Sequence, residues 1–382
     1  MSTLEELREK LDQVDDQIVE LYEQRSKLTE EVGEYKIRNG IKVFDRQREH
    51  DKLQNVAAKA TTDFNKKGIR EIFEQLMSIS RKKQYQQLVE AGALGRLPFI
   101  EVDSLHAEHA RIVFPGTEGA YSQAAMQDYF GENCNSFYVR TFRDAMESIE
   151  EGAADFAVLP IENTTAGAVD EMYDLLVEFE NYIVAETIIP ITHTLSGLPG
   201  TKLSDIERVY SKGVALMQAS RYLDEHSDWQ QISVANTAIA AKKILDEQDM
   251  TQAAVCSAYA AKVHGLEILE DNINDNPNNF TRFIVVTNQK IFLKDAKKIS
   301  ICFEVPHESG SLYHLLSHFI YNDLNMSKIE SRPIEGRNWE YRFFVDFEGN
   351  LADAAVKNAI RGLREESRSL KILGNYSAED DI

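Results

Sequence analysis

The sequence predicts a multidomain protein with an all-α N-terminal domain, a central α/β domain and a small α+β domain at the C-terminus. Three observations support this prediction. Apolar residues at helical spacing fill about the first 90 positions, strand and helix patterns alternate from about 111 to 288, and the remainder reads βαββαβ. A chain of 382 residues that is 43% hydrophobic has room for two or three folded cores.

Composition excludes several function classes. The formal net charge is −21 and the pI is near 4.9, which argues against a nucleic-acid partner. The charged start MSTLEELREKLDQ and the lack of an apolar run of roughly 18 residues argue against a signal peptide and a membrane span, so we expect a cytoplasmic protein. Three distant cysteines without metal-ligand spacing are expected to be core thiols. A small acidic ligand would therefore need locally placed cations.

Three helices are expected in the N-terminal domain, over residues 4–38, 46–60 and 69–90. The first should end at Asn39-Gly40, which favours a helix C-cap. At 1.5 Å per residue it would be about 50 Å long, too long for two shorter helices to cover. We therefore expect it to pair with the same helix of a second chain, and a free coiled-coil arm is the alternative. Its apolar stripe comprises Leu4, Leu7, Leu11, Val14, Ile18, Leu21, Leu28 and Val32.

Arg25 interrupts this stripe, and Lys36 follows on nearly the same helical face. Their Cα atoms would lie about 16 Å apart, so the two long side chains could hold one small ligand. Arg8 would lie about 25 Å from Arg25 and could reach that ligand only from the partner of an antiparallel pair. Further polar candidates follow at helical spacing, although each taken singly is more typical of a solvated helix surface: Asp45, Arg48, Glu49, Ser80 and Gln84.

Residues 93–109 are expected to form a linker, and the α/β domain should follow it. Its alternating pattern predicts largely parallel sheets with ligand-binding loops at the carboxyl ends of the strands. The expected strands are 111–114, 137–142, 156–161, 182–188, 209–211, 232–235, 253–256 and 280–287.

Three loops of this domain carry candidate ligand-binding residues. The first, VFPGTEGAYSQ, presents Tyr121 and Ser122 before a helix, without the GxGxxG or P-loop spacing of nucleotide sites. The second ends an apolar strand with IENTT, where an elaborate helix cap is the alternative. The third begins an apolar strand with Thr281-Arg282, which offers a hydroxyl and a guanidinium at the edge of a core.

The C-terminal domain is expected as strand 298–305, helix 311–322, strands 327–332 and 340–347, helix 351–366 and strand 369–374. A small unit of this kind appended to an enzyme is often a regulatory ligand sensor. Gly310-Ser311 at the first strand-to-helix turn and the stretch ESRP at 330–333 are its candidate ligand-binding positions. Arg332, however, is equally typical of a surface ion pair.

The N-terminal segment resembles the helical chorismate mutases in LREKLDQVDDQIVELYEQR, EVGEYK and VFDRQREHDKL. The later segments resemble prephenate dehydratase with its amino-acid-sensing ACT domain, so the resemblance covers essentially the whole chain. It implies the bifunctional chorismate mutase/prephenate dehydratase family of phenylalanine biosynthesis. It also implies an intertwined helical mutase dimer over 1–92, a two-lobed dehydratase over 110–289 and a ferredoxin-like ACT domain over 297–376.

The mutase reaction implied by the resemblance is an intramolecular rearrangement of chorismate to prephenate. It needs a compact substrate conformation and complementary charge, and no nucleophile, metal or cofactor. By resemblance, Arg25 pairs with one of the two substrate carboxylates, and Arg8 of the partner chain pairs with the other. Lys36 and Gln84 donate to the ether oxygen, and Glu49 accepts a hydrogen bond from the ring hydroxyl. The remaining implied substrate-binding residues are Asp45, Arg48 and Ser80.

The dehydratase reaction implied by the resemblance removes carbon dioxide and water from prephenate and aromatises its ring. The resemblance assigns Thr281 to departure of the hydroxyl and Arg282 to a carboxylate. The other implied substrate-binding residues are Ser122, Glu162, Asn163, Thr164, Ser211 and Gln218. One loop departs from the family pattern VYSHPQ: the chain reads VYSKGVALMQ, with Lys212, Gly213 and Val214 in place of His-Pro-Gln.

The ACT resemblance implies inhibition by phenylalanine bound between paired domains, at Gly310, Ser311, Leu312, Glu330, Ser331, Arg332 and Pro333. The expected partners are thus chorismate, prephenate and phenylalanine, in a homodimer or a higher oligomer without cofactor, metal, nucleic acid or membrane. Two alternatives remain open. One is a non-catalytic sensor of a small acid, which the altered loop would favour, and the other is a mutase and sensor with an impaired dehydratase.

Overall fold

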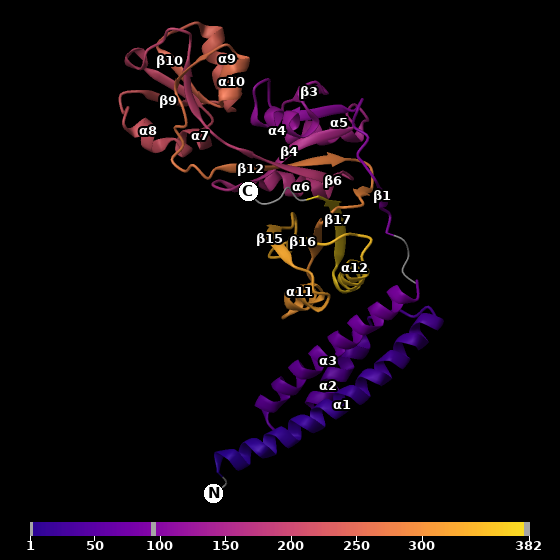
Figure 1. Cartoon of the computed structure of the whole chain (residues 1–382). Helices are drawn as coiled ribbons and strands as arrows, with labels where there is room; N and C mark the ends of the chain where they lie inside the picture. Colours follow the sequence, from indigo (N-terminus) through magenta and orange to yellow (C-terminus); the bar gives the residue numbers. More distant parts are fainter. Residues whose placement is uncertain (1–2, 93–96, 378–382) are drawn as a thin grey trace. The chain divides into compact units, whose positions relative to one another are not determined.

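The structure is a computed structural model that describes residues 3–92 and 97–377 (Figure 1). The chain divides into two compact units. One takes in the residues up to Leu97 together with Phe303–Leu370, and the other takes in Pro98–Cys302 together with the residues from Lys371 onward. The first unit is mainly helical, whereas the second contains two lobes with separate sheets.

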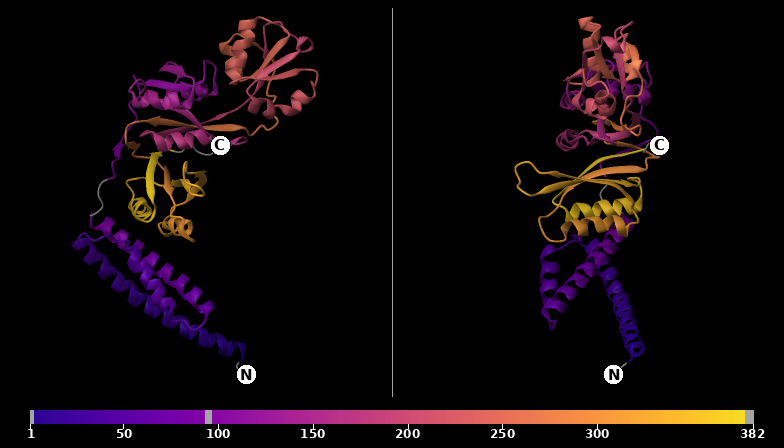
Figure 2. Two further views of the ribbon diagram at one scale, coloured as in Figure 1. Left: turned by 180° about the vertical axis from the view of Figure 1, so that it is seen from behind. Right: turned by 90° about the vertical axis from the view of Figure 1, so that its left-hand side faces the viewer.

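Three helices, α1 (Leu4–Arg38), α2 (Arg46–Ala57) and α3 (Asp63–Glu90), pack side by side in the first unit (Figure 1, Figure 2). The expected limits of α1 are confirmed: Thr3 and Glu6 form a capping box at its start, and Asn39 caps its end. In contrast, α2 ends at Ala57 and not at residue 60, and α3 begins at Asp63 and not at residue 69. The Thr62 hydroxyl caps α3 by accepting from Asn65 N at 3.1 Å, so Gly68, expected in the loop, lies inside the helix.

The apolar stripe of α1 is exposed along its length. Gly33 is the only buried residue among the 35 residues of this helix, and it lies where α1 packs against α3. The stripe residues have exposed fractions from 45% at Val32 to 64% at Leu4. A continuous exposed apolar surface of this kind is typical of a protein contact surface.

The C-terminal elements follow the expected order: β14 (Lys298–Glu304), α11 (Ser311–Tyr321), β15 (Met326–Pro333), β16 (Tyr341–Glu348), α12 (Ala354–Glu366) and β17 (Ser369–Tyr376). Every limit lies within three residues of the expected one. Strands β15 and β16 form an antiparallel hairpin. Within the first unit, α12 packs against both α3 and α11.

The second unit has one sheet in each of two lobes, and the chain crosses between the lobes twice (Figure 1). The sheet of the first lobe has the strand order β3-β2-β4-β12-β6 and continues from β6 into β17 and β14. The elements of this lobe are β2 (Arg111–Pro115), α4 (Tyr121–Phe130), β3 (Asn135–Val139), α5 (Phe142–Glu150), β4 (Phe156–Asn163), β5 (Gly167–Ala168), α6 (Asp170–Glu178), β6 (Tyr182–Pro190) and β12 (Phe280–Thr287).

The second lobe has the strand order β11-β7-β10-β8-β9. Its elements are β7 (Thr194–Gly197), a 3-10 turn at Leu203–Asp205, β8 (Arg208–Ser211), α7 (Gly213–Gln218), α8 (Ser220–Asp224), β9 (Gln230–Ser233), α9 (Thr237–Glu247), β10 (Gln252–Cys256), α10 (Ala258–Val263) and β11 (Glu267–Glu270). Each lobe has its own apolar core, centred on residues such as Phe114 and Val158 in the first lobe and Val209 and Val255 in the second.

The expectation of largely parallel sheets is wrong. Strand β2 does pair in parallel with β3 and β4, and β8 does so with β9 and β10. However, β12 is antiparallel to both β4 and β6, and β7 is antiparallel to β10 and β11. The cause is the return of the chain from the second lobe, which brings β12 into the first sheet in the reverse direction.

Part of the expected linker is a strand. Strand β1 (Ile100–Val102) pairs in parallel with β13 (Ile291–Leu293). Residues 93–96 of that linker lie outside the described residues. Among the expected core thiols, Cys256 and Cys302 are buried and Cys134 is partly buried. Within the described ranges, no helix combines the length and apolar character needed to cross a membrane.

Replacing Gly362 by alanine tests the close packing of α12 on α11. A Cβ at this position would lie 2.2 Å from Cε1 of the buried His318 ring. In an unobstructed helix the same change stabilises by about 1 kcal/mol. We therefore expect Gly362→Ala to lower the Tm. The matched Gly68→Ala in α3, where no atom lies within 4 Å of the added Cβ, should raise it. Thermal unfolding measures both, and a higher Tm for Gly362→Ala would contradict the packing described.

Candidate functional site

Two cations of α1 are held by oxygen atoms of neighbouring segments. Arg25 donates through Nη1 to Leu76 O at 3.0 Å and to Ser80 Oγ at 2.5 Å, both on α3. Lys36 donates through Nζ to Val43 O at 2.6 Å, in the segment that leads into α2. Burial lowers the pKa of both side chains, because it disfavours their charged forms. Each cation is thus partly desolvated and directed, as a binding site for a small anion requires.

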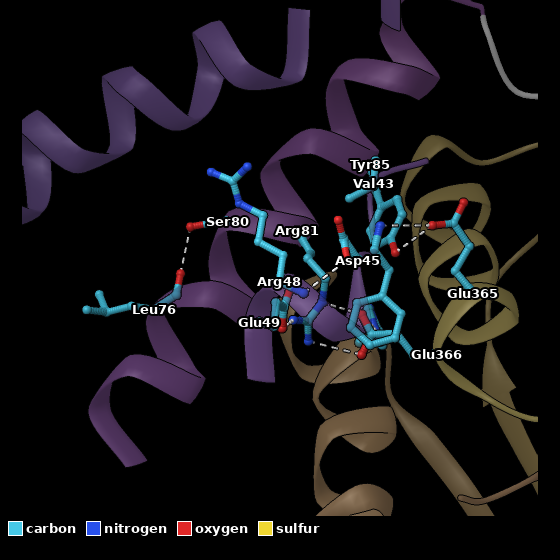
Figure 3. A network of polar contacts seen from close by, with 12 residues as sticks. Val43, Asp45, Arg48, Glu49, Leu76, Ser80, Arg81, Tyr85, Glu365 and Glu366 are labelled. Carbon is cyan, nitrogen blue, oxygen red and sulfur yellow. Dashed lines mark hydrogen bonds and ion pairs between the residues drawn. The ribbon is translucent and has the colours of Figure 1, made fainter. Parts of the chain in front are cut away.

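The expected residues of α2 serve different purposes. Asp45 is the N-cap of the helix, and its Oδ1 accepts a hydrogen bond from Arg48 N at 3.1 Å. Glu49 accepts through Oε2 from Arg81 Nη1 on α3, and the Arg48 side chain extends from α2 in the same region (Figure 3). Asp45 therefore orients the start of the helix that carries the other two residues.

Arg81, which the sequence analysis did not single out, lies at the centre of this polar network (Figure 3). Its Nε and Nη2 donate to the Glu366 carboxylate at 2.8 and 3.2 Å, and its guanidinium lies 5.0 Å from the centre of the Phe44 ring. Burial would lower the pKa of Arg81, yet the charges of Glu366 and Glu49 raise it. Burial would raise the pKa of Glu366, yet Arg81 and His318 bring it down to about 2. The buried pair is therefore ionised at neutral pH.

Gln84 and Arg8 complete the expected set in contrasting positions. Gln84 is buried on α3, one turn beyond Ser80, and its Oε1 is a buried atom that accepts no hydrogen bond within the described part of the chain. A buried acceptor without a partner calls for an explanation, and the amide nitrogen of the same group is the donor that the expected contact with an ether oxygen requires. Arg8 is exposed on α1, about 25 Å along the helix from Arg25. A single chain therefore does not bring Arg8 to the other residues.

The second unit contains a cavity of about 400 Å³ lined by both of its lobes. Four of the expected residues line it: Ser122, Asn163, Gln218 and Thr281. Other polar side chains line it as well: Tyr121, Arg140, His193, Lys212, Asn236 and Thr237. The altered loop thus contributes a cation to the cavity.

Thr281 and Asn163 meet because β12 runs antiparallel to β4 and its second residue pairs with the last residue of β4. Asn163 donates through Nδ2 to Thr281 Oγ1 at 2.9 Å and to Asn279 Oδ1 at 2.8 Å. The backbone N–H groups of Thr165 and Ala166 donate to Asn163 Oδ1, which fixes the orientation of the amide. Because Asn163 is the donor, the Thr281 hydroxyl retains its own proton for another acceptor.

A row of three side chains crosses the cavity. The His193 ring lies with Nδ1 3.1 Å from the Tyr121 hydroxyl and Nε2 3.0 Å from Gln218 Oε1. Gln218, in the second lobe, also donates through Nε2 to Thr165 Oγ1 of the first lobe at 2.7 Å. Burial lowers the pKa of His193, so the ring is neutral at neutral pH. The row therefore links the two lobes through neutral hydrogen-bonding groups.

The remaining expected residues of this domain have protein partners. Arg282 forms ion pairs with Glu162 at 2.8 Å and Glu186 at 3.3 Å. It alternates along β12 with Thr281 and Phe283, and the cavity lining includes those two and not Arg282. Ser211 is fully buried and donates to a backbone carbonyl of β10 at 2.6 Å, and Thr164 ties its loop to the start of β12. Arg140 and Lys212 are the cations among the described residues that line the cavity.

Another cavity, of about 410 Å³, lies at the start of α11. Gly310, Ser311 and Leu312 line it, together with Trp339 and Tyr341. Gly310 has a φ of +82°, a left-handed conformation that favours glycine. The expected residues 330–333 lie instead on β15, outside the lining of this cavity. One chain therefore does not bring the two expected phenylalanine motifs into one cavity.

Local sequence held little sign of the residues that were missed. Arg81 bonds to a residue 285 positions away, and His193 contacts side chains 72 and 25 positions away. Arg140 precedes a helix cap and resembles any exposed loop cation. Only Lys212 had been noted, as a departure from a family pattern.

Two known sequence families match the chain: chorismate mutase type II over residues 7–85 and prephenate dehydratase over residues 112–291. The bifunctional chorismate mutase/prephenate dehydratase of Aquifex aeolicus is 32% identical over 380 residues, which cover 98% of each chain. That of Escherichia coli is 30% identical over 383 residues, 98% of this chain and 96% of the other. The crystal structure of a prephenate dehydratase from Arthrobacter aurescens in complex with L-Phe is 31% identical, with a TM-score of 0.66 over 71% of this chain and 90% of the other.

Proposed function

Because the chain belongs to the bifunctional chorismate mutase/prephenate dehydratases, we propose that each of its two reactions takes place at one of the candidate sites described above. The protein is an enzyme of aromatic amino acid biosynthesis that converts chorismate to prephenate and prephenate to phenylpyruvate. The observation that carries the assignment is the grouping of Asn163 with Thr281 in one cavity and of Arg25 with Ser80 in a separate region. We assign the mutase to residues 1–92, the dehydratase to 110–289 and an ACT domain to 297–376.

The mutase region supplies directed charge, which is what a pericyclic rearrangement can use. Arg25 is held by oxygen atoms of α3, so its remaining donors can take a substrate carboxylate. Lys36 and Gln84 then donate to the ether oxygen as negative charge develops there. Glu49 accepts from the ring hydroxyl. Arg48, Ser80 and Asp45 border or orient these groups.

The second carboxylate of chorismate is assigned to Arg8 of a partner chain. The exposed apolar stripe of α1 supports a homodimer, because pairing two copies of this helix would bury it. An antiparallel pairing would carry one copy's Arg8 toward the other copy's Arg25. The mutase site is incomplete without this second copy.

The dehydratase cavity suits a small dianion that loses carbon dioxide and hydroxide. The Thr281 hydroxyl, which accepts from Asn163 and retains its proton, donates to the departing ring hydroxyl. Arg140 and Lys212 are placed to bind carboxylates. The engagement of Arg282 with two protein carboxylates supports a role in holding β12 in place. The altered loop contributes Lys212 to the cavity lining, so it favours a working dehydratase over an impaired one.

Phenylalanine is proposed as the inhibitor, and the solved dehydratase that binds L-Phe supports this. The βαββαβ order supports a ferredoxin-like ACT domain. We assign the amino acid to the cavity at Gly310, Ser311 and Leu312 of one chain, closed by residues 330–333 of its partner. Its coupling to prephenate must be reciprocal, so each ligand weakens the other's binding. The enzyme is proposed to be cytoplasmic and to need no cofactor.

Lys36→Ala separates the two activities. Loss of the donor to the ether oxygen should lower mutase kcat by about 10²–10³. Dehydratase turnover of added prephenate should stay at the wild-type level, because that cavity lies in the other unit. The matched Lys52→Ala, at an exposed position of α2, should leave both activities unchanged. Chorismate consumption and phenylpyruvate formation are the readouts, and wild-type mutase turnover in Lys36→Ala would refute the assignment of Lys36.

Thr281→Val is the corresponding test of the dehydratase. The variant loses the hydroxyl proton, so dehydratase kcat should fall by about 10²–10⁴ while mutase turnover is retained. Thr287→Val on the same strand is the matched control, because Thr287 is buried and its Oγ1 has no hydrogen-bond partner among the described residues. The measurement is the steady-state rate of each variant with prephenate. Equal rates for the two variants would remove Thr281 from the reaction.

A further inference from the structure

Arg81 is connected to the mutase site through Glu49. Its Nη1 donates to Glu49 Oε2, so α3 holds the carboxylate that α2 presents. A carboxylate has two oxygen atoms, and the bond to Arg81 uses one of them. The other oxygen can still accept a hydrogen bond from a substrate hydroxyl. The direction in which it points is set by the bond to Arg81.

Arg81 is in turn fixed from the opposite side. Two of its nitrogen atoms donate to both oxygens of Glu366 on α12, which is the fork geometry that guanidinium groups form with carboxylates. The Phe44 ring lies 5.0 Å from the guanidinium carbon, and the Arg81 side chain is 8% exposed. Figure 3 shows the guanidinium between Glu49 and Glu366. A side chain held at this many points has little rotational freedom left.

Glu366 belongs to a packed helix pair and not to a mobile surface. Its Oε1 lies 3.1 Å from His318 Nε2 on α11, and α12 approaches that ring closely at Gly362. Lys82, next to Arg81 on α3, donates to Ser317 Oγ of α11 at 2.8 Å. Two neighbouring residues of α3 are therefore bonded to the C-terminal helices. The position of Glu49 depends on this contact through a single intermediate, Arg81.

We propose that Arg81 is a positioning residue for Glu49 in the mutase reaction, and that Glu366 of α12 fixes Arg81 in that role. The proposal rests on the assignment of Glu49 to the ring hydroxyl of chorismate. A displacement of about 1 Å in a substrate-positioning group can cost on the order of 10² in rate. The mutase therefore depends on the C-terminal helices as well as on the helical domain that carries its substrate-binding residues.

The test removes the buried pair as a unit, in the full-length protein. Replacing Arg81 alone would leave Glu366 buried and unpaired, so Arg81→Met is combined with Glu366→Met. The matched control combines Lys66→Met with Asp63→Met, an exposed ion pair at 3.0 Å on the same α3. Each pair is made in the wild-type chain and in a Glu49→Gln chain. Mutase kcat/KM with chorismate, dehydratase turnover with added prephenate and the Tm are measured for all of them.

The expected result is a coupling between Arg81 and Glu49. The Arg81/Glu366 pair should lower mutase kcat/KM by about tenfold or more in the wild-type chain and by less than about twofold in the Glu49→Gln chain. Dehydratase turnover should be unchanged, and the control pair should change neither activity. A purely structural role would instead lower kcat/KM by the same factor in both chains.

Three results would overturn the proposal or its premise, and they are distinguishable. An unchanged mutase kcat/KM, or an equal loss in both chains, rejects the role of Arg81. An unchanged kcat/KM in Glu49→Gln alone rejects the assignment of Glu49 itself. If the pair variant also loses its dehydratase activity, Arg81→Lys replaces it, since lysine keeps the charge and lacks the fork. Full mutase activity in Arg81→Lys, or an equal loss in the two chains, then rejects the proposal.

Discussion

Cations held in place by protein oxygen atoms are the constraint on which the proposed mutase site depends. The substrates are anions, and the chain carries a formal charge of −21, so its overall field opposes their binding. That field is screened within about 10 Å at moderate ionic strength, whereas partly buried charges are screened less. Arg25 and Lys36 are both partly buried and bonded to oxygen atoms nearby. The local placement of these two cations therefore matters more for the binding of an anion than the net charge of the chain does.

The same constraint accounts for the arrangement of carboxylates. Glu366 neutralises Arg81 in a buried environment, and Arg81 in turn directs Glu49. Glu162 and Glu186 do the same for Arg282 on β12, which leaves Thr281 facing the cavity. Acidic residues thus hold cations in place. Each such ion pair neutralises part of the excess negative charge at that position.

Strand direction matters as much as charge in the dehydratase. Because β12 enters the sheet against β4, the hydroxyl of Thr281 arrives beside the amide of Asn163. A parallel β12 would place Thr281 at the opposite end of the sheet. Gln218 then joins the two lobes by bonding to both His193 and Thr165. The cavity is therefore assembled from chain segments that are far apart in sequence.

The sequence was informative where the determining interactions are local. The limits of α1 follow from the Thr3 and Glu6 capping box, and the βαββαβ order follows from periodicity, so both were predicted. The start of α3 was misplaced because Gly68 is a typical turn residue. The helix instead begins at Asp63, directly after its N-cap Thr62.

Features that depend on contacts between distant parts of the chain could not be predicted from the sequence in the same way. The direction of β12 depends on a chain reversal through another lobe, and periodicity does not record it. Arg81 acquires its significance from a partner 285 positions away, and Arg140 from a cavity formed by two lobes. The proposed roles of Arg8, Gln84 and Thr281 rest on family resemblance.

The two reactions are proposed to take place at two independent sites of one chain. Mixing purified Lys36→Ala and Thr281→Val proteins with chorismate tests this independence. Each protein alone should form phenylpyruvate from chorismate at least about 10² times more slowly than the wild type. The mixture should form it much faster, because prephenate made by one protein can be used by the other. A mixture that forms phenylpyruvate no faster than either protein alone would contradict this assignment.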